Sequence, residues 1–258
     1  MELNFKKFGK GEPIIILHGL FGSLDNWATA GKKLAKDYTV YLTDQRNHGH
    51  SPHDDQFDYD AMSNDLEELI NSENLESVIL IGHSMGGKTA MFYSVYNPEK
   101  VKKLIIVDIA PKSYPVHHDG IIDALLSLNL ESIKERSEAD EQLSKLIPDT
   151  PTRQFLLKSL HWAKENKNQN LEWRFNLKAI EKHIKNVGEP LPFNAIFDGQ
   201  TLFINGENSN YITDKDKEII HHHFPNSQIK SISGAGHWVH AEKPKEFLNT
   251  VIVFLKED

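Results

Sequence analysis

The stretch that decides the fold is VILIGHSMGGKTAMF, residues 78–92. Its first four residues, Val78 to Ile81, are aliphatic and strand-like, and a helical pattern begins at Gly87. Between them stands Gly-x-Ser-x-Gly, with Ser84 at its centre. A turn this sharp leaves no room for side chains at the two glycines, and it holds the serine hydroxyl out at the carboxyl end of the strand. The segment therefore predicts a nucleophile, Ser84, on a strand-to-helix turn.

Short apolar runs on either side of this segment alternate with helical patterns. The expected strands are 13–17, 38–43, 78–82, 103–109, 201–205 and 228–232. The expected helices are 26–36, 59–72, 87–96, 214–223 and 244–255. Alternation of strand and helix is typical of a parallel sheet, and near-continuous apolar strands indicate burial on both faces. The sequence thus predicts an α/β fold with a mostly parallel, doubly wound sheet.

The alternation stops between residues 111 and 198. This segment is helical in pattern, rich in charge and interrupted by Pro148, Pro151 and Pro190, and it contains no run typical of a strand. We interpret it as a helical cap that leaves the sheet after the strand at 103–109. The expected organisation is a core of residues 1–110 and 199–258 with a cap of residues 111–198.

Composition excludes several classes of protein. The chain has 258 residues, a formal net charge of −8 and no Cys, which excludes disulfides, a thiolate nucleophile and Cys-based metal sites. No apolar run approaches the roughly 18 residues that span a bilayer. An acidic chain without a dense basic stripe argues against a nucleic-acid partner. The first residues lack a basic and then apolar signal, so we expect a cytoplasmic location.

A serine nucleophile needs a general base, and the sequence offers 14 His as candidates. His237 follows the small-residue run Gly234-Ala235-Gly236 after the last expected strand, so its imidazole can project over the edge of the sheet. Residues 221–223 are also His, but they fall late in an expected helix, where they favour its C-terminus. We expect His237 to be the base and no metal to be involved.

The carboxylate that orients the base has three candidates. Ser209, after the strand at 201–205, cannot supply a negative charge, and the end of another strand could serve equally well. Asp108 lies at the end of the 103–109 strand and is the preferred candidate, because the geometry of a triad matters and its sequence positions do not. Glu207 and Asp214 are the alternatives, and Asp108 would then only stabilise its loop.

Acyl transfer also needs hydrogen-bond donors for the developing oxyanion. The residue after the nucleophile, Met85, supplies one amide, and the loop LHGLFG at residues 17–22 supplies the other. Within this loop Leu20 is the preferred donor and Phe21 the second. We interpret His83 as a wall of the substrate pocket.

Four motifs together make the chain similar to the α/β-hydrolase superfamily. They are DQRNHGHS at 44–51, GHSMGGK at 82–88, VDIAP at 107–111 and GAGHWVHAEKP at 234–244. More narrowly, the chain resembles the small YbfF-like bacterial esterases and their mammalian mitochondrial relatives. In the cap, only WRFNL at 173–177 resembles the sequences of that family.

The resemblance implies a Ser-His-Asp triad whose acid follows the family's sixth strand, which here corresponds to the strand before Asp108. It also implies a helical cap, no cofactor, and ester or acyl-thioester substrates. Trp238 resembles a bulky pocket residue of that family. Phe21, Trp173 and Arg174 are carried over as further pocket candidates.

The function expected from all of this is hydrolysis of small-molecule carboxylic esters or acyl thioesters through an acyl-enzyme. Other triad chemistry, such as carbon–carbon bond hydrolysis or a peroxidase-type reaction, is the enzymatic alternative, and a non-catalytic hydrolase-like binding protein is the alternative from another class. Residues 150–190 carry eight Lys and Arg against four Asp and Glu. Lys158, Lys164, Lys167 and Arg174 are therefore candidates for docking an anionic acyl-CoA.

Overall fold

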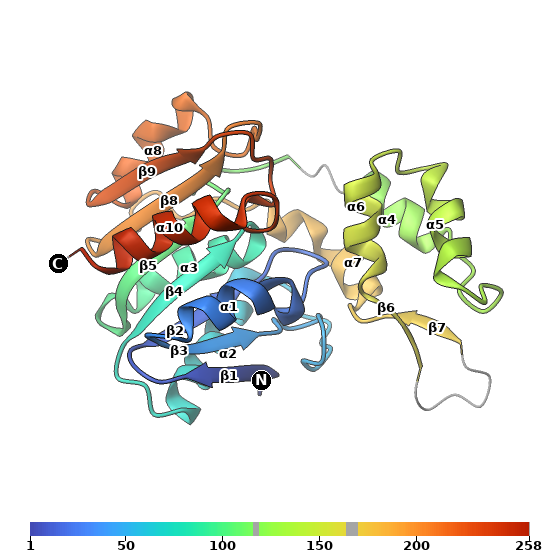
Figure 1. The fold of residues 1–258 in the computed structure, drawn as a ribbon, viewed down its shortest axis with the longest axis horizontal. Helices are drawn as coiled ribbons and strands as arrows, with labels where there is room; N and C mark the ends of the chain where they lie inside the picture. The colour runs from blue at the N-terminus through green and yellow to red at the C-terminus, as the bar shows by residue number, and fades with distance from the viewer. Residues whose placement is uncertain (116–118, 164–169, 258) are drawn as a thin grey trace.

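The computed structural model describes residues 1–115, 119–163 and 170–257, and it is built around one seven-stranded sheet (Figure 1). The strands, in chain order, are β1 (Phe5–Gly9), β2 (Pro13–Leu17), β3 (Thr39–Thr43), β4 (Val78–His83), β5 (Val101–Val107), β8 (Gln200–Gly206) and β9 (Ser227–Ile232). Their spatial order is β1-β3-β2-β4-β5-β8-β9, and only the β1–β3 pair is antiparallel. The predicted mostly parallel sheet is confirmed.

Helices pack on both faces of this sheet. The helices of the core are α1 (Ala28–Leu34), α2 (Tyr59–Ser72), α3 (Met85–Tyr96), α8 (Lys217–His223), α9 (Val239–Glu242) and α10 (Pro244–Leu255), with short 3₁₀ turns at Leu24–Trp27, Pro98–Lys100 and Asp214–Asp216. Successive strand residues point to opposite faces. Ile14 and Ile16 of β2 join one apolar cluster with α1 and α10, while Ile15 and Leu17 join another with α2, α3 and α8.

The strand β1 was absent from the sequence prediction. It reads FKKFG, and its two lysines, Lys6 and Lys7, are exposed. This edge strand lacks the apolar run that identified the central strands, because none of its residues is buried. The antiparallel β1–β3 pair is therefore a feature that only the structure reveals.

The segment between β5 and β8 lies to one side of the sheet (Figure 1). It contains α4 (Asp119–Leu126), α5 (Arg136–Ser144), α6 (Thr150–Leu157) and α7 (Leu177–Val187). It also contains an antiparallel hairpin of β6 (Leu160–Trp162) and β7 (Leu171–Trp173), so the expectation of a cap without strands was wrong. The three-residue strands are too short to give a periodic signal. None of the helices in the described ranges is long and apolar enough to cross a membrane.

The two chain segments that join this cap to the core run side by side. The amide of Leu191 donates to the carbonyl of Pro111 at 3.0 Å, and the amide of Tyr114 donates to the carbonyl of Gly188 at 2.9 Å. We call residues 111–115 and 187–191 the cap stems. They leave and rejoin the core beside the carboxyl end of β5, which is where Asp108 lies.

Candidate active site

Ser84 occupies the single-residue turn between β4 and α3. Its φ of 52° lies in the left-handed region that residues with a Cβ rarely adopt, and its amide donates to the carbonyl of Val107 at 3.0 Å. A Cβ at Gly82 would lie 2.3 Å from the carbonyl oxygen of Gly86, and one at Gly86 would lie 2.5 Å from the oxygen of Leu17. Both glycines are therefore required by the close approach of β2, β4 and α3, as the sequence motif predicts.

His237 and Asp108 meet across the ends of two loops. His237 Nδ1 lies 2.7 Å from Asp108 Oδ2, and Asp108 is fully buried. Because a carboxylate can only accept, Nδ1 carries the proton, and Nε2 is left to accept one. The other carboxylate oxygen, Oδ1, accepts from the amide of Gly206 at 3.1 Å. This is the hydrogen-bond pattern that a base and its orienting acid require.

Ser209, which stands where an acid is usual, turns out to contact the acid itself. Its hydroxyl donates to Asp108 Oδ2. The two alternative acids bind elsewhere: Glu207 Oε2 accepts from Ser233 Oγ at 2.7 Å, and the exposed Asp214 pairs with Lys217 at 2.8 Å. Of the three candidate carboxylates, the structure brings Asp108 to His237.

Two amide N–H groups near Ser84 point to an oxyanion site. Those of Leu20 and Met85 donate to no other residue in the described part of the chain. The amide of Phe21, in contrast, donates to His48 Nε2 at 3.1 Å, so it is already engaged. This difference favours Leu20 over Phe21 as the second donor. Phe21 has a φ of 61°, and its carbonyl accepts from Ser159 Oγ of the cap at 3.0 Å.

The loop of Leu20 rests on two buried histidines, His18 and His48. His48 Nδ1 donates to the carbonyl of Arg46 at 2.9 Å, which fixes the tautomer whose Nε2 accepts from Phe21. His18 Nδ1 donates to the carbonyl of Gly19 at 2.8 Å. Burial lowers the pKa of His18 to about 4 and that of His48 to about 3. Both imidazoles are therefore neutral near pH 7, as their hydrogen bonds require.

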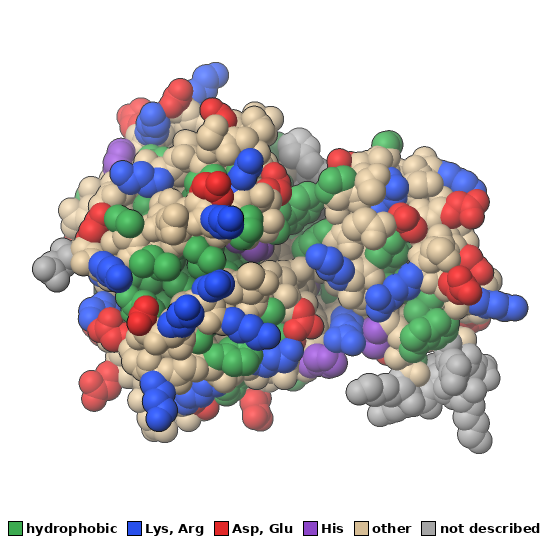
Figure 2. Space-filling view, viewed as in Figure 1, with side chains coloured by type: hydrophobic (Ala, Val, Ile, Leu, Met, Phe, Trp, Pro, Cys, Tyr) green, Lys and Arg blue, Asp and Glu red, His purple; other side chains and the backbone are tan. Residues whose placement is uncertain are grey.

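A cavity of about 240 Å³ opens above Ser84 between the core and the cap. Its lining from the core includes Leu20, Phe21, His83, Ser84, Tyr211, His237 and Trp238. Its lining from the cap is Ile121, Thr152, Phe155 and Leu156. Figure 2 shows apolar side chains gathered at this junction, with Lys and Arg side chains along the cap beside it. Such a mostly apolar hollow with a few polar groups is typical of a small-molecule site.

A family model described as the alpha/beta hydrolase fold matches residues 12–145. The chain belongs to the α/β-hydrolase family. It is 38% identical to the sn-1-specific diacylglycerol lipase ABHD11 of Danio rerio, covering 96% of this chain and 80% of the relative. It is 36% identical to the esterase YbfF of Escherichia coli K12, covering 95% of this chain and 93% of the relative.

Among solved structures, this α/β hydrolase is similar to a marine microorganism esterase. The TM-score is 0.94 at 46% identity, covering 98% of this chain and 99% of that one. Nearly the whole chain is thus similar in sequence to esterases and a lipase, and similar in structure to an esterase. The protein is a serine hydrolase that acts on ester substrates.

The structure separates the predicted pocket residues into two groups. His83, Phe21 and Trp238 line the cavity of this α/β hydrolase. Trp173 and Arg174 do not: Trp173 stacks on Phe175 with ring centroids 5.2 Å apart, and Arg174 Nη1 lies 3.0 Å from His50 Nε2. Lys164 and Lys167 lie outside the described residues.

Tyr211 is the residue of the site that sequence reasoning missed most clearly. Its ring stacks on that of His237, with centroids 4.0 Å apart and planes at 20°. Its hydroxyl-bearing ring also lines the cavity beside Ser84. Tyr211 lies two residues after Ser209 in a loop without regular spacing, so the sequence carries no periodic signal for it.

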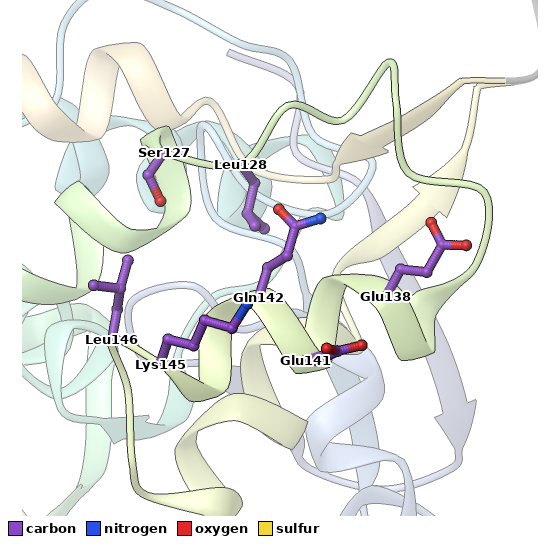
Figure 3. A pocket seen from close by; sticks show the side chains of 7 residues that line it. All are labelled: Ser127, Leu128, Glu138, Glu141, Gln142, Lys145 and Leu146. Carbon is purple, nitrogen blue, oxygen red and sulfur yellow. The ribbon is translucent and has the colours of Figure 1, made fainter.

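A wider hollow of about 670 Å³ lies on the cap beside α5, away from these residues (Figure 3). Its lining consists of Ser127, Leu128, Glu138, Glu141, Gln142, Lys145 and Leu146. It is an open groove with both polar and apolar walls, and it includes none of the triad candidates. Across the described ranges, no group of three or more His, Asp or Glu side chains is placed to hold a metal ion.

Proposed function

We propose that Ser84, His237 and Asp108 form the catalytic triad of a carboxylesterase. The observation that carries this proposal is the 2.7 Å contact between His237 Nδ1 and Asp108 Oδ2, together with the cavity that both His237 and Ser84 line. His237 Nε2 takes the proton of the Ser84 hydroxyl while Oγ attacks the carbonyl carbon of the ester. Asp108 holds the imidazole in the required tautomer and stabilises the imidazolium that forms.

In the next step the amides of Leu20 and Met85 donate to the oxyanion of the tetrahedral intermediate. Collapse of the intermediate breaks the bond to the alcohol, and His237 returns its proton to the departing oxygen. Water, deprotonated by the same imidazole, then attacks the acyl-enzyme and releases the acid. Two chemical steps thus share one base and one oxyanion site.

The test compares two serine variants of the same helix region. Ser84→Ala should lower kcat for a simple ester by about 10⁴ to 10⁶ and abolish labelling by a fluorophosphonate. Ser94→Ala is the matched control, because Ser94 is buried in α3 and its hydroxyl donates only to the carbonyl of Met91. Turnover by Ser84→Ala above a few per cent of wild type would contradict the assignment. Labelling of Ser84 without turnover of any ester would instead indicate a hydrolase-like binding protein.

Acyl thioesters of anionic carriers are a second proposed substrate class. Lys158 follows Phe155 and Leu156 of the cavity wall by less than one helical turn. The pKa of His240 is lowered mainly by burial, then by His237 and, third, by the charge of Lys158, which therefore lies near this imidazole. Arg174 lies farther along the same cap surface beside His50. Positive charge at the mouth of the site favours a phosphorylated leaving group such as that of acyl-CoA.

Salt dependence tests this second class. Attraction between exposed charges weakens at high ionic strength, so kcat/KM for acetyl-CoA should fall several-fold between low and high salt. For an uncharged acetate ester it should stay constant. Lys158→Ala should remove much of the difference, with Lys32→Ala on α1 as the control. Equal salt responses for the two substrates would contradict the proposal.

We also propose that the enzyme works in the cytoplasm. A chain without Cys needs no disulfide and is suited to a reducing compartment. Fractionation of cells that express the protein tests this placement.

A further inference from the structure

Two cavities, and not one, meet at Ser84. The larger, of about 240 Å³, is the one that His237 and Trp238 line. The smaller, of about 30 Å³, is lined by Ser84 and Met85 on the core side. Its other walls come from Ile109, Tyr211 and Ile184, and from Tyr114, Pro115, Val187 and Gly188 of the cap stems.

The chemistry of the triad assigns these cavities to the two halves of an ester. The departing alcohol must receive its proton from His237, so it has to lie on the side of Ser84 that His237 lines. This is the larger cavity. The acyl chain then leaves the tetrahedral carbon in another direction, toward the cavity that Met85 lines and His237 does not.

The smaller cavity sets a limit on the acyl chain. In the same measure its volume is about one eighth of that of the larger cavity, 30 Å³ against 240 Å³. The carbonyl carbon is bonded to Ser84 and its oxygen lies at the oxyanion amides, so neither takes up this space. The acyl side therefore offers little room, and long chains collide with its walls.

The walls of this cavity are held by a buried lysine, Lys88. Its side chain is fully buried in α3, one helical turn after Ser84. The ammonium group donates to the carbonyl of Lys112 in one cap stem, at 2.7 Å, and to the carbonyl of Glu189 in the other. It also lies 5.4 Å from the centre of the Tyr114 ring.

Placing an ammonium group there has a cost in free energy, because burial lowers the pKa of Lys88 to about 7. The two carbonyls it binds belong to segments 77 residues apart in sequence, from Lys112 to Glu189. Tyr114 lies two residues after Lys112, and Gly188 lies one residue before Glu189. Both residues line the cavity. A cross-link at this point fixes how far the stems stand from the nucleophile helix.

We propose that this enzyme is selective for esters of short acids with bulky apolar alcohols, and that Lys88 maintains this selectivity by holding both cap stems. The inference rests on the proposed triad, since it takes His237 as the proton donor to the alcohol. Lys88 acts through the stems and is a positioning residue.

A series of 1-naphthyl esters from acetate to octanoate tests the acyl limit. We expect kcat/KM to fall at least about tenfold between butanoate and octanoate, because a chain that overfills a packed site is rejected. Ile184→Ala should widen the cavity and raise the octanoate-to-acetate ratio at least about tenfold. Ile180→Ala is the matched control, because Ile180 is buried in the same helix α7 but lines neither cavity. A wild-type kcat/KM that rises to octanoate would overturn the inference.

A pair of buried lysines tests the role of Lys88. Lys88→Met should raise the octanoate-to-acetate ratio, because the stems are released. Lys103→Met is the control: Lys103 is also buried, and it donates to the carbonyls of Phe254 and Leu255 at the far end of β5. Its loss should lower stability and leave the ratio unchanged. Lys88→Arg, which keeps a cationic donor, should retain the wild-type ratio.

Each outcome separates this inference from the proposed triad. Fluorophosphonate labelling of Ser84 with a flat or rising acyl profile overturns the short-acyl inference alone. Failure of labelling, with turnover kept in Ser84→Ala, overturns the triad. An unchanged ratio in Lys88→Met removes the role of Lys88. If that variant does not fold, the wild-type ester series and Ile184→Ala decide the acyl limit, and the ratio in Lys88→Arg decides whether a cation at this position maintains it.

Discussion

The carboxyl edge of the sheet and the cap contribute different things to the same site. From the edge come Ser84, His237 and Asp108, together with the amides of Leu20 and Met85. From the cap come mainly apolar side chains, with Thr152 as the polar exception. The edge therefore supplies the groups that move protons and stabilise charge, while the cap supplies shape.

Backbone strain follows the same division. In the described part of the chain five non-glycine residues have positive φ. Phe21, Asn47, Ser84 and Asp108 follow the carboxyl ends of parallel strands, and the fifth, Asn74, follows α2. Strain of this kind persists only where the surroundings fix the backbone, and the paired strands do so here. Variants at the edge should therefore change kcat for every substrate, whereas variants in the cap should change which substrate is preferred.

The largest effect is expected for the acid at the edge. Asp108→Asn keeps the shape of the side chain but favours the wrong tautomer of His237, so kcat should fall at least about 10²-fold. Steady-state kinetics on a short and a bulky ester should show the same loss for both. Glu207→Gln and Asp214→Asn should stay within a few-fold of wild type. The reverse pattern would return the acid to the loop after β8.

The next effect concerns the support of the oxyanion loop. His48→Leu removes the acceptor of the Phe21 amide, so the loop that carries Leu20 should shift and kcat should fall about 10- to 100-fold with little change in KM. His48→Gln can place an amide oxygen near the position of Nε2 and should recover much of the loss. Equal kcat values for the two variants would show that the acceptor is unimportant.

Acid sensitivity should also come from the edge. His18 and His48 are neutral when folded, with pKa values of about 4 and 3, whereas unfolded His titrates near 6.5. As the pH falls below 6.5, only the unfolded state gains protons at these two sites. The free energy of unfolding therefore decreases with falling pH until the pH reaches the pKa values of the folded state. Each of the two histidines lowers the free energy of unfolding by at most about 1.4 kcal/mol per pH unit.

Urea unfolding between pH 7 and 4.5 measures this contribution. The His48→Gln variant should lose stability less steeply than wild type as the pH falls. His221→Gln, on the exposed surface of α8, is the control for loss of a histidine. Parallel stability curves for His48→Gln and wild type would contradict the neutral, buried state of His48.

The smallest effect is expected in the cap. Phe155 lines the larger cavity from α6, and its ring lies 5.3 Å from that of Trp238. Phe155→Ala should raise KM a few-fold for an ester with a bulky alcohol and leave kcat for ethyl acetate nearly unchanged. Leu146→Ala, in the hollow of Figure 3, should change neither value. A large fall in kcat for both esters would mean that the cap does more than shape the site.

The sequence predicts this enzyme best where local chemistry decides the structure. The central strands stand out because their apolar runs are buried on both faces, and Gly82 and Gly86 stand out because no side chain fits there. Asp108 could be preferred over Glu207 from its place at a strand end, and the structure places it against His237.

What the sequence does not reveal depends on contacts between distant residues. The bond from the Phe21 amide to His48 joins positions 27 apart, and the bond from Ser159 to Phe21 joins positions 138 apart. Neither has a spacing that periodicity can detect. Trp173 and Arg174 were expected in the pocket, but Phe175 stands between Trp173 and Phe21, and Arg174 contacts His50.

The exposed lysines of the outer strands bear on how the protein behaves at high concentration. The sheet ends in β1 on one side and β9 on the other, and each leaves a row of backbone groups without a strand partner. Lys6 and Lys7 on β1 and Lys230 on β9 place charge along these borders. Lys6 pairs with Asp25 and Lys7 with Glu73, so another strand that joined this border would have to remove water from charged groups. The side chains that hid β1 from sequence reasoning thus also make this border an unfavourable template for a neighbouring molecule.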